Sequence, residues 1–129
     1  MDRPPVAHLW HLAINVRDVE MMERFYADVM GFRTEWKPDP DNVYMTTGKD
    51  NLAIHRGEAG AETRLAHFGL VVARAEDVDV WAAWIRDHGV ALETEPRTHR
   101  DGARSFYFRD PEGNVIQLIH HPPISPAVA

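Results

Sequence analysis

The sequence predicts an α+β fold built from two copies of one β-α-β-β-β unit. The first observation is an internal repeat, because the segment from His11 to Gly31 matches the segment from His67 to Gly89. The second is that each copy passes from a short alternating strand pattern to apolar residues at helical spacing. The third is that short β-prone runs, separated by turn residues, follow each glycine. We expect the two units to form one cupped mixed sheet.

In the first unit, residues 11–16 alternate as a strand, and residues 18–30 have apolar side chains at helical spacing. Asp18 is the expected N-cap of this helix, and Gly31 is placed where a left-handed C-terminal residue is favoured. The turn residues that follow predict three strands. These strands are residues 32–36, 42–46 and 52–55.

The second unit follows the same order. Residues 67–72 predict a strand, and residues 77–88 predict a helix with Asp77 as N-cap and Gly89 at its end. The remaining strands are expected at residues 91–94, 104–108 and 115–119.

The chain of 129 residues fits one domain. Within it we expect units at 7–56 and 65–121, a linker at 57–64 and a loose tail at 122–129.

Composition narrows the classes of function. The absence of cysteine excludes disulfides, thiolate metal sites and cysteine nucleophiles, and it favours a cytoplasmic location. The sequence has neither a signal-like start nor an apolar run of bilayer length, so no membrane partner is expected. The net charge of −6, with scattered acidic residues, argues against nucleic acid as a partner, because nucleic-acid binding requires clustered Lys and Arg.

Strand alternation predicts which side chains share the concave face of the sheet, because residues two apart point the same way. The polar members of that face are His11, His55, His67 and Gln117. Small residues at Ala13, Ala53 and Gly69 leave room for a ligand beside them.

Three imidazoles and one amide oxygen suit a divalent ion such as Zn, Ni, Co or Fe. A single histidine in a sheet is more often hydrogen-bonded than metal-bound. The equivalent positions of these residues in the two units favour the metal site.

These motifs resemble the vicinal oxygen chelate superfamily, which includes glyoxalase I, bleomycin resistance proteins, methylmalonyl-CoA epimerase and extradiol dioxygenases. The resemblance rests on the histidines that open each unit, on the helix ending FYADVMGF, and on the closing FYFRDPEGNVIQL. It implies the paired-unit fold, a homodimer, a small-molecule ligand and a divalent metal, with Zn, Ni, Fe, Co and Mn not distinguished.

The resemblance also implies that the metal ligands come from the first and last strands of each unit, which map onto His11, His55, His67 and Gln117. Many metal-using relatives have Glu at the last position. Gln cannot accept a proton, and we expect no other Glu or Asp to point inward, so glyoxalase I activity is not expected.

Further candidate ligand-binding residues are Asn15, Tyr44, Arg104 and Tyr107, although a plain structural role is the commoner one for such residues. Two functions remain open. One is a metal-dependent lyase, isomerase or dioxygenase-like enzyme that uses the ion as a Lewis acid. The other is a metal-free protein that binds and sequesters a drug or metabolite.

Overall fold

The computed structural model describes residues 1–57, 65–109, 111 and 113–128. It contains two compact units, here named the N-half unit (His11–His67) and the C-half unit (Met1–Trp10 with Phe68–Ala129). The predicted pair of βαβββ units is confirmed. The sequence repeat and the compact units differ at one end, because the first ten residues group with the C-half unit.

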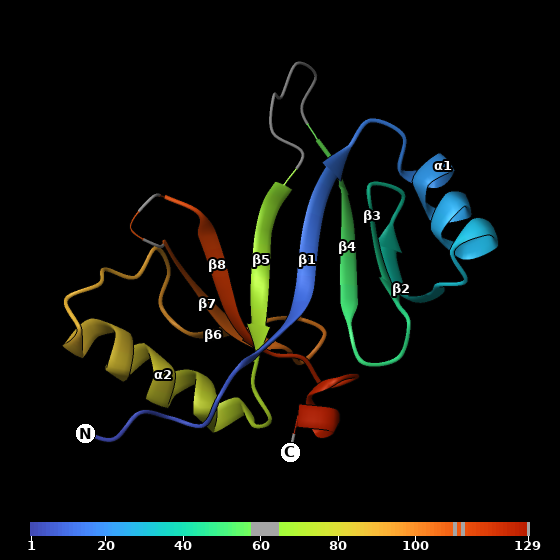
Figure 1. The fold of residues 1–129 in the computed structure, drawn as a ribbon. Coiled ribbons are helices and arrows are strands. Elements are labelled where there is room, and N and C mark those ends of the chain that lie inside the picture. Colours follow the sequence, from blue (N-terminus) through green and yellow to red (C-terminus); the bar gives the residue numbers. More distant parts are fainter. Residues whose placement is uncertain (58–64, 110, 112, 129) are drawn as a thin grey trace. The chain divides into compact units, whose positions relative to one another are not determined.

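In the N-half unit, the strands lie in the order β2-β3-β4-β1 (Figure 1). β1 runs parallel to β4, and the other neighbours are antiparallel. The strands are β1 (His8–Val16), β2 (Arg33–Asp39), β3 (Asn42–Thr46) and β4 (Asn51–Arg56), and the helical segments are α1 (Val19–Arg24) and the π-helix η1 (Phe25–Val29).

The first helix begins as predicted and then changes type. The Asp18 carboxylate accepts a hydrogen bond from the Met21 amide at 3.0 Å, which confirms the N-cap. The single predicted helix is instead an α-helix followed by the π-helical turn of η1. Gly31 has φ of +80°, as its C-terminal position requires.

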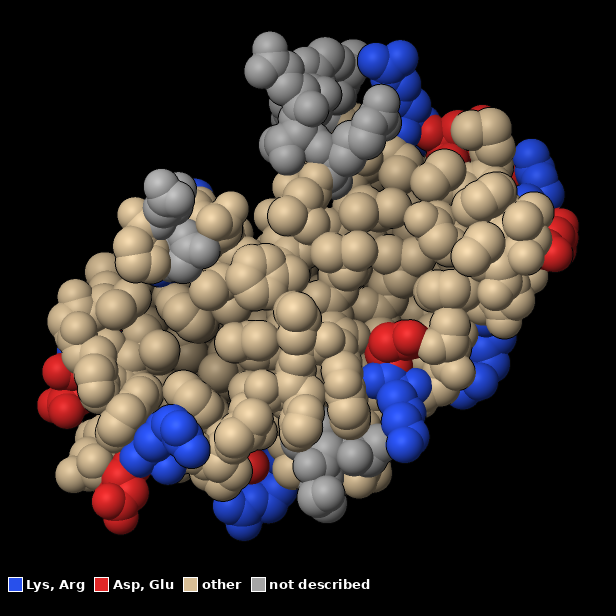
Figure 2. Space-filling model, in the orientation of Figure 1, with Lys and Arg blue, Asp and Glu red and all other residues tan. Residues whose placement is uncertain are grey.

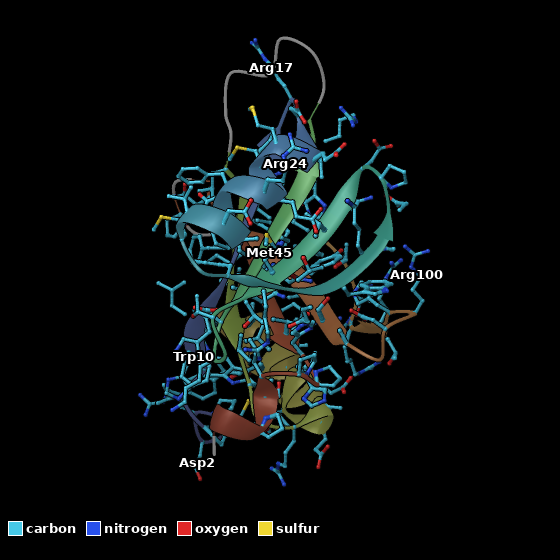
Figure 3. All side chains as sticks on the ribbon, turned by 90° about the vertical axis from the view of Figure 1, so that its right-hand side faces the viewer. Asp2, Trp10, Arg17, Arg24, Met45 and Arg100 are labelled. Carbon is cyan, nitrogen blue, oxygen red and sulfur yellow. The ribbon has the colours of Figure 1, made fainter. Side chains whose placement is uncertain are left out.

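The core of the N-half unit lies between α1 and the strands. Val19, Val43, Met45 and Ile54 are fully buried there, and Figure 3 shows Met45 beside the helix. On β4, Leu52 and Ile54 lie in this core, as the predicted alternation with Ala53 and His55 requires.

In the C-half unit, the strands lie in the order β5-β8-β7-β6, and α2 packs against β7 and β8 (Figure 1). β5 runs parallel to β8, and the other pairs are antiparallel. Phe106 and Leu118 are buried under α2. The elements are β5 (Leu65–Val71), α2 (Ala75–Asp87), β6 (Arg97–Thr98), β7 (Arg104–Arg109), β8 (Val115–His120) and the 3₁₀ helix η2 (Ser125–Val128).

Two predicted boundaries in the C-half unit are wrong. α2 begins before Asp77, whose carboxylate accepts hydrogen bonds from the Arg74 backbone amide at 3.2 Å and guanidinium at 3.0 Å. The strand predicted at 91–94 is a single bridge from Leu92 to Phe108. Pro96 offers no N–H for strand pairing, and the paired strand β6 begins only after it.

The predicted loose tail is also wrong. Ile124 is 2% exposed and packs with Val71, Ala103 and Ile119. The Ser125 hydroxyl, which is fully buried, accepts a hydrogen bond from the backbone amide of His121 at 2.8 Å. Apolar burial therefore holds this segment against the C-half unit.

The predicted linker at 57–64 lies outside the described residues apart from Gly57. In the described part of the chain, no helix is both long and apolar enough to cross a bilayer.

Candidate metal and ligand site

Two predicted ligands of the N-half unit face each other. The Nε2 atoms of His11 on β1 and His67 on β5 are 2.8 Å apart, and the ring centroids are 4.9 Å apart. His11 is 7% exposed. The structure therefore brings these two imidazole rings together with their Nε2 atoms facing each other.

The Nδ1 atom of His11 contacts a residue that was not predicted from strand alternation. Asn51 stands opposite His11 in the β1–β4 register, and its Oδ1 is 2.7 Å from His11 Nδ1. The predicted fourth strand began at residue 52, whereas β4 begins at Asn51. Extending the predicted strand by one residue would have placed Asn51 on the same face as Ala53 and His55.

A carboxylate also reaches this group. The Asn51 Nδ2 donates a hydrogen bond to Glu35 Oε2 at 3.2 Å. The β2–β3 register shifts between Thr34 and Trp36, so Glu35 is an extra residue in a β-bulge. The expectation that no other acidic residue points inward is wrong, because a bulge redirects side chains and strand alternation cannot predict it.

His55 does not join His11 and His67. Its Nδ1 lies 2.6 Å from Asn42 Oδ1, and its ring meets Tyr44 edge-on with centroids 5.9 Å apart. It lies four residues beyond Asn51 on β4, which is about 13 Å along a strand. Burial lowers the pKa of His55 and favours its neutral form.

Of the three predicted histidine ligands, His11 and His67 lie together, whereas His55 contacts Asn42 and Tyr44. Among the described residues, no group of three or more His, Asp or Glu side chains is arranged to hold a metal ion.

An aromatic pair lies on the His11 face of the N-half unit. The rings of Trp36 and Tyr44 stack with centroids 5.3 Å apart at 18°. Tyr44 stands opposite Ala53, and Ala53 stands opposite Ala13. The row from β1 to β2 thus runs from two small residues to two half-buried aromatic rings, which suits contact with a flat ligand.

Asn15 stands opposite His55 in the β1–β4 register. Gly57 approaches it closely, because a Cβ added to Gly57 would lie 2.9 Å from Asn15 Cβ. Only glycine therefore fits at this position without displacing Asn15.

The fourth predicted ligand, Gln117, lies on β8 of the C-half unit. Its Nε2 donates a hydrogen bond to Ser105 Oγ at 3.0 Å, and His99 Nε2 lies 2.7 Å from the same oxygen. Gln117 is 5% exposed and Ser105 is 1% exposed. The serine therefore fixes the amide nitrogen of Gln117 and turns the carbonyl oxygen away from itself.

The two other candidates of the C-half unit differ in position. Tyr107 stands opposite Gln117 in the β7–β8 register and shares its face. Arg104 forms an ion pair with Asp79 on α2, with contacts of 2.7 and 2.9 Å, and it holds the pKa of that carboxyl below its usual value. The Arg104 side chain therefore lies on the face of the sheet that α2 covers.

The surface charges are mixed in sign. On the face drawn in Figure 2, blue and red side chains lie near one another around uncharged areas. This agrees with the scattered acidic residues of the sequence.

The donor chemistry of His11 and His67 fits a divalent transition metal. Two imidazole nitrogens bound to one tetrahedral ion at 2.0–2.1 Å lie roughly 3.3 Å apart. The Nε2 atoms are 2.8 Å apart, so both nitrogens already face the same point and need to separate by only about half an ångström to share an ion. The contact of His11 Nδ1 with an amide oxygen is also the kind of outer hydrogen bond that orients metal-binding histidines.

Comparison with known proteins gives the family. Residues 8–118 match the model of the Glyoxalase/Bleomycin resistance protein/Dioxygenase superfamily. The chain is 28% identical over 120 residues to catechol-2,3-dioxygenase of Bacillus subtilis, covering 86% of this chain and 40% of that protein. It is 26% identical over 118 residues to metallothiol transferase FosB of Staphylococcus epidermidis, covering 84% of this chain and 78% of FosB.

Solved structures show the same fold. The Mn(II)-bound glyoxalase from Novosphingobium aromaticivorans has a TM-score of 0.75 at 22% identity, covering 92% of this chain and 40% of that one. A methylmalonyl-CoA epimerase bound to methylmalonyl-CoA has a TM-score of 0.68 at 22% identity, covering 92% and 97%. The chain spans well under half of the dioxygenase and the glyoxalase, and nearly all of the epimerase. This chain belongs to the Glyoxalase/Bleomycin resistance protein/Dioxygenase superfamily.

Proposed function

We propose that this protein binds a divalent transition-metal ion through His11 and His67 and acts on a small molecule that carries two neighbouring oxygens. The observation that supports this most is the 2.8 Å separation of the two Nε2 atoms. When bound, the ion supplies Lewis-acid chemistry. Its identity is open among Zn, Ni, Fe, Co and Mn.

The chain's own residues have separate roles in this proposal. Asn51 holds the His11 ring through Nδ1, so the ring is oriented before any ion binds. In the C-half unit, the Gln117 amide nitrogen donates to Ser105 Oγ, and its carbonyl oxygen is the atom we propose as an acceptor for a ligand of that unit. In the N-half unit, Asn15 is the polar side chain proposed to orient the small molecule, and Tyr107 shares the face of Gln117 in the C-half unit.

A flat, oxygen-bearing ligand suits the N-half unit. Trp36 and Tyr44 offer aromatic surface on the same face as His11. Two relatives are named for catechol and for biphenyl-2,3-diol. Both compounds have two oxygens on neighbouring carbons of an aromatic ring. These names support the ligand class for the present chain without assigning a reaction to it.

Metal content measured on protein made without a polyhistidine tag tests the metal proposal. We expect the wild type to bind a stoichiometric transition metal in equilibrium dialysis, and His11→Ala or His67→Ala to reduce occupancy sharply. His88→Ala is a matched control, because His88 is exposed at the end of α2. Wild-type affinity in the double variant His11→Ala/His67→Ala would contradict the site.

The second candidate function is metal-free binding and sequestration of a drug or metabolite. It is favoured by the finding that, in the described part of the chain, acidic and histidine side chains form no three-membered metal group. The net charge of −6 suits a cationic ligand. Absence of metal after mild purification, together with saturable binding of a cationic small molecule, would favour this function.

We also propose that the protein is a cytoplasmic homodimer, on the basis of the family resemblance and the lack of cysteine. Sedimentation equilibrium of the purified protein tests the dimer. A mass of one chain across a hundredfold range of concentration would contradict it.

A further inference from the structure

Glu35, Asn51 and His11 form a chain of hydrogen bonds that leads to the nitrogen facing His67. Glu35 Oε2 lies 3.2 Å from Asn51 Nδ2, and Asn51 Oδ1 lies 2.7 Å from His11 Nδ1. Asn51 is 4% exposed and His11 is 7% exposed. Bulk water is therefore largely excluded from the middle of the chain.

The hydrogen bond between Glu35 and Asn51 determines which atom donates and which accepts in the rest of the chain. An ionised carboxylate only accepts hydrogen bonds, so the Asn51 atom that faces Glu35 must be the amide nitrogen. The carbonyl oxygen of Asn51 then faces His11. Because a carbonyl oxygen also only accepts, His11 Nδ1 must carry the ring proton. In a neutral imidazole this leaves a lone pair on Nε2.

We propose that Glu35 is a positioning residue that selects the Nδ1–H tautomer of His11 through Asn51, so that Nε2 presents a lone pair toward His67. At an Nε2 separation of 2.8 Å, a neutral His67 then donates from its own Nε2 in the metal-free protein. The tautomer does not depend on metal binding. Only its consequence for metal affinity rests on the proposed function.

Loss of the carboxylate charge removes the selection. An amide at position 35 both donates and accepts, so Asn51 can reverse its side chain and direct its Nδ2 toward His11. His11 Nδ1 then accepts, and the ring proton moves to Nε2, where it blocks the lone pair. A carboxylate that served only to fill space would have no such effect on the ring.

Nitrogen-15 NMR of the histidine rings in the full-length, metal-free protein reads the tautomer directly. We expect His11 to be Nδ1-protonated in the wild type and to populate both tautomers in Glu35→Gln. Glu20→Gln is the matched control, because Glu20 is an exposed residue whose carboxylate pairs with Arg24 on α1. It should leave the His11 signals unchanged.

A polarity swap provides a rescue. In Glu35→Gln/Asn51→Asp, the residue at position 35 donates and the residue at position 51 accepts from both sides, so the Nδ1–H tautomer should return. With Zn as the probe, isothermal titration should show about a ten- to a hundredfold loss of affinity in Glu35→Gln. Most of that loss should be recovered in the double variant, which is the coupling expected of residues in one network.

The outcomes separate this inference from the proposed function. Tautomer changes in a protein that binds no metal would overturn the proposed function and support the role of Glu35. Unchanged His11 signals in a folded Glu35→Gln protein would overturn the role of Glu35. Where Glu35→Gln lacks the wild-type circular dichroism spectrum, Glu35→Asp is the second variant. It keeps the charge but withdraws the carboxylate by one methylene, and unchanged signals there would also overturn the inference.

Discussion

Ser105 and Gln117 are joined across β7 and β8 by a hydrogen bond of 3.0 Å between Gln117 Nε2 and Ser105 Oγ, and both residues are buried. Removing the hydroxyl in Ser105→Ala leaves the buried Nε2 without this acceptor. We expect the free energy of unfolding to fall by about 1–3 kcal/mol, the usual cost of an unsatisfied buried polar group. Urea unfolding monitored by tryptophan fluorescence measures the change.

The double variant Ser105→Ala/Gln117→Met is the control for that result. It replaces both polar partners with apolar groups, which can be nearly neutral. Recovery of part of the lost stability would support the hydrogen bond as the cause. A single variant as stable as the wild type would show that the bond contributes little.

Metal removal should destabilise the protein if the ion binds only the folded state. A free ligand at about a hundred times its dissociation constant adds roughly 2.7 kcal/mol to the free energy of unfolding. We expect a chelator to lower the Tm and added Zn, Ni or Co to restore it in differential scanning calorimetry. In His11→Ala/His67→Ala, the Tm should not respond to either addition. A wild type equally indifferent to both would favour metal-free binding.

Stability should decrease as the pH falls below about 6.5. Burial lowers the pKa of His55 in the folded state from its ordinary value of 6.5. In this range the unfolded chain therefore binds a proton at His55 that the folded chain does not, and stability falls with pH. Urea unfolding of metal-free protein between pH 7.5 and 5 should show a smaller slope for His55→Gln than for the wild type. His88→Gln is the exposed control, and an equal slope in all three proteins would argue against a buried neutral His55.

Glyoxalase I activity should be negligible in the wild type, because Gln117 replaces the carboxylate and Glu35 is engaged by the Asn51 amide, and it should increase, if at all, in Gln117→Glu. Isomerisation needs a base near the substrate carbon, and a positioned base contributes about 10²–10⁴ in rate. The assay is isomerisation of a glutathione hemithioacetal by the metal-loaded protein. Robust wild-type turnover that is lost in Glu35→Gln would make Glu35 the base and would contradict the interpretation of Gln117.

The architecture was predicted well because both units repeat one sequence pattern. Strand alternation is a reliable signal where one face of a sheet is buried, as at Val43, Met45 and Ile54. The helix ends were also predictable, because Gly31 and Gly89 have the positive φ that glycine tolerates. The same patterns could not locate the start of α2. Its capping carboxylate comes from inside the helix, whereas the sequence pattern assumed a cap before it.

The candidate site was predicted less completely. The pairing of His11 with His67 agrees with their equivalent positions in the sequence repeat, although β1 and β5 begin before them, at His8 and Leu65. Glu35 could not be predicted, because its direction depends on an extra residue in β2 that strand alternation does not reveal. His55 is on the expected strand, but distance along that strand separates it from the other two imidazoles.

The π-helical turn at Phe25–Val29 has a consequence for insertions and deletions. A π-turn carries one residue more than an α-turn and commonly arises as a single-residue bulge in an α-helix. Deleting Asp28 would therefore let α1 continue as a regular helix up to Gly31, whereas deleting a residue within α2 would rotate every later apolar side chain by about 100° from its buried position. The first helix of this chain can therefore lose one residue and keep its packing, whereas the second helix cannot.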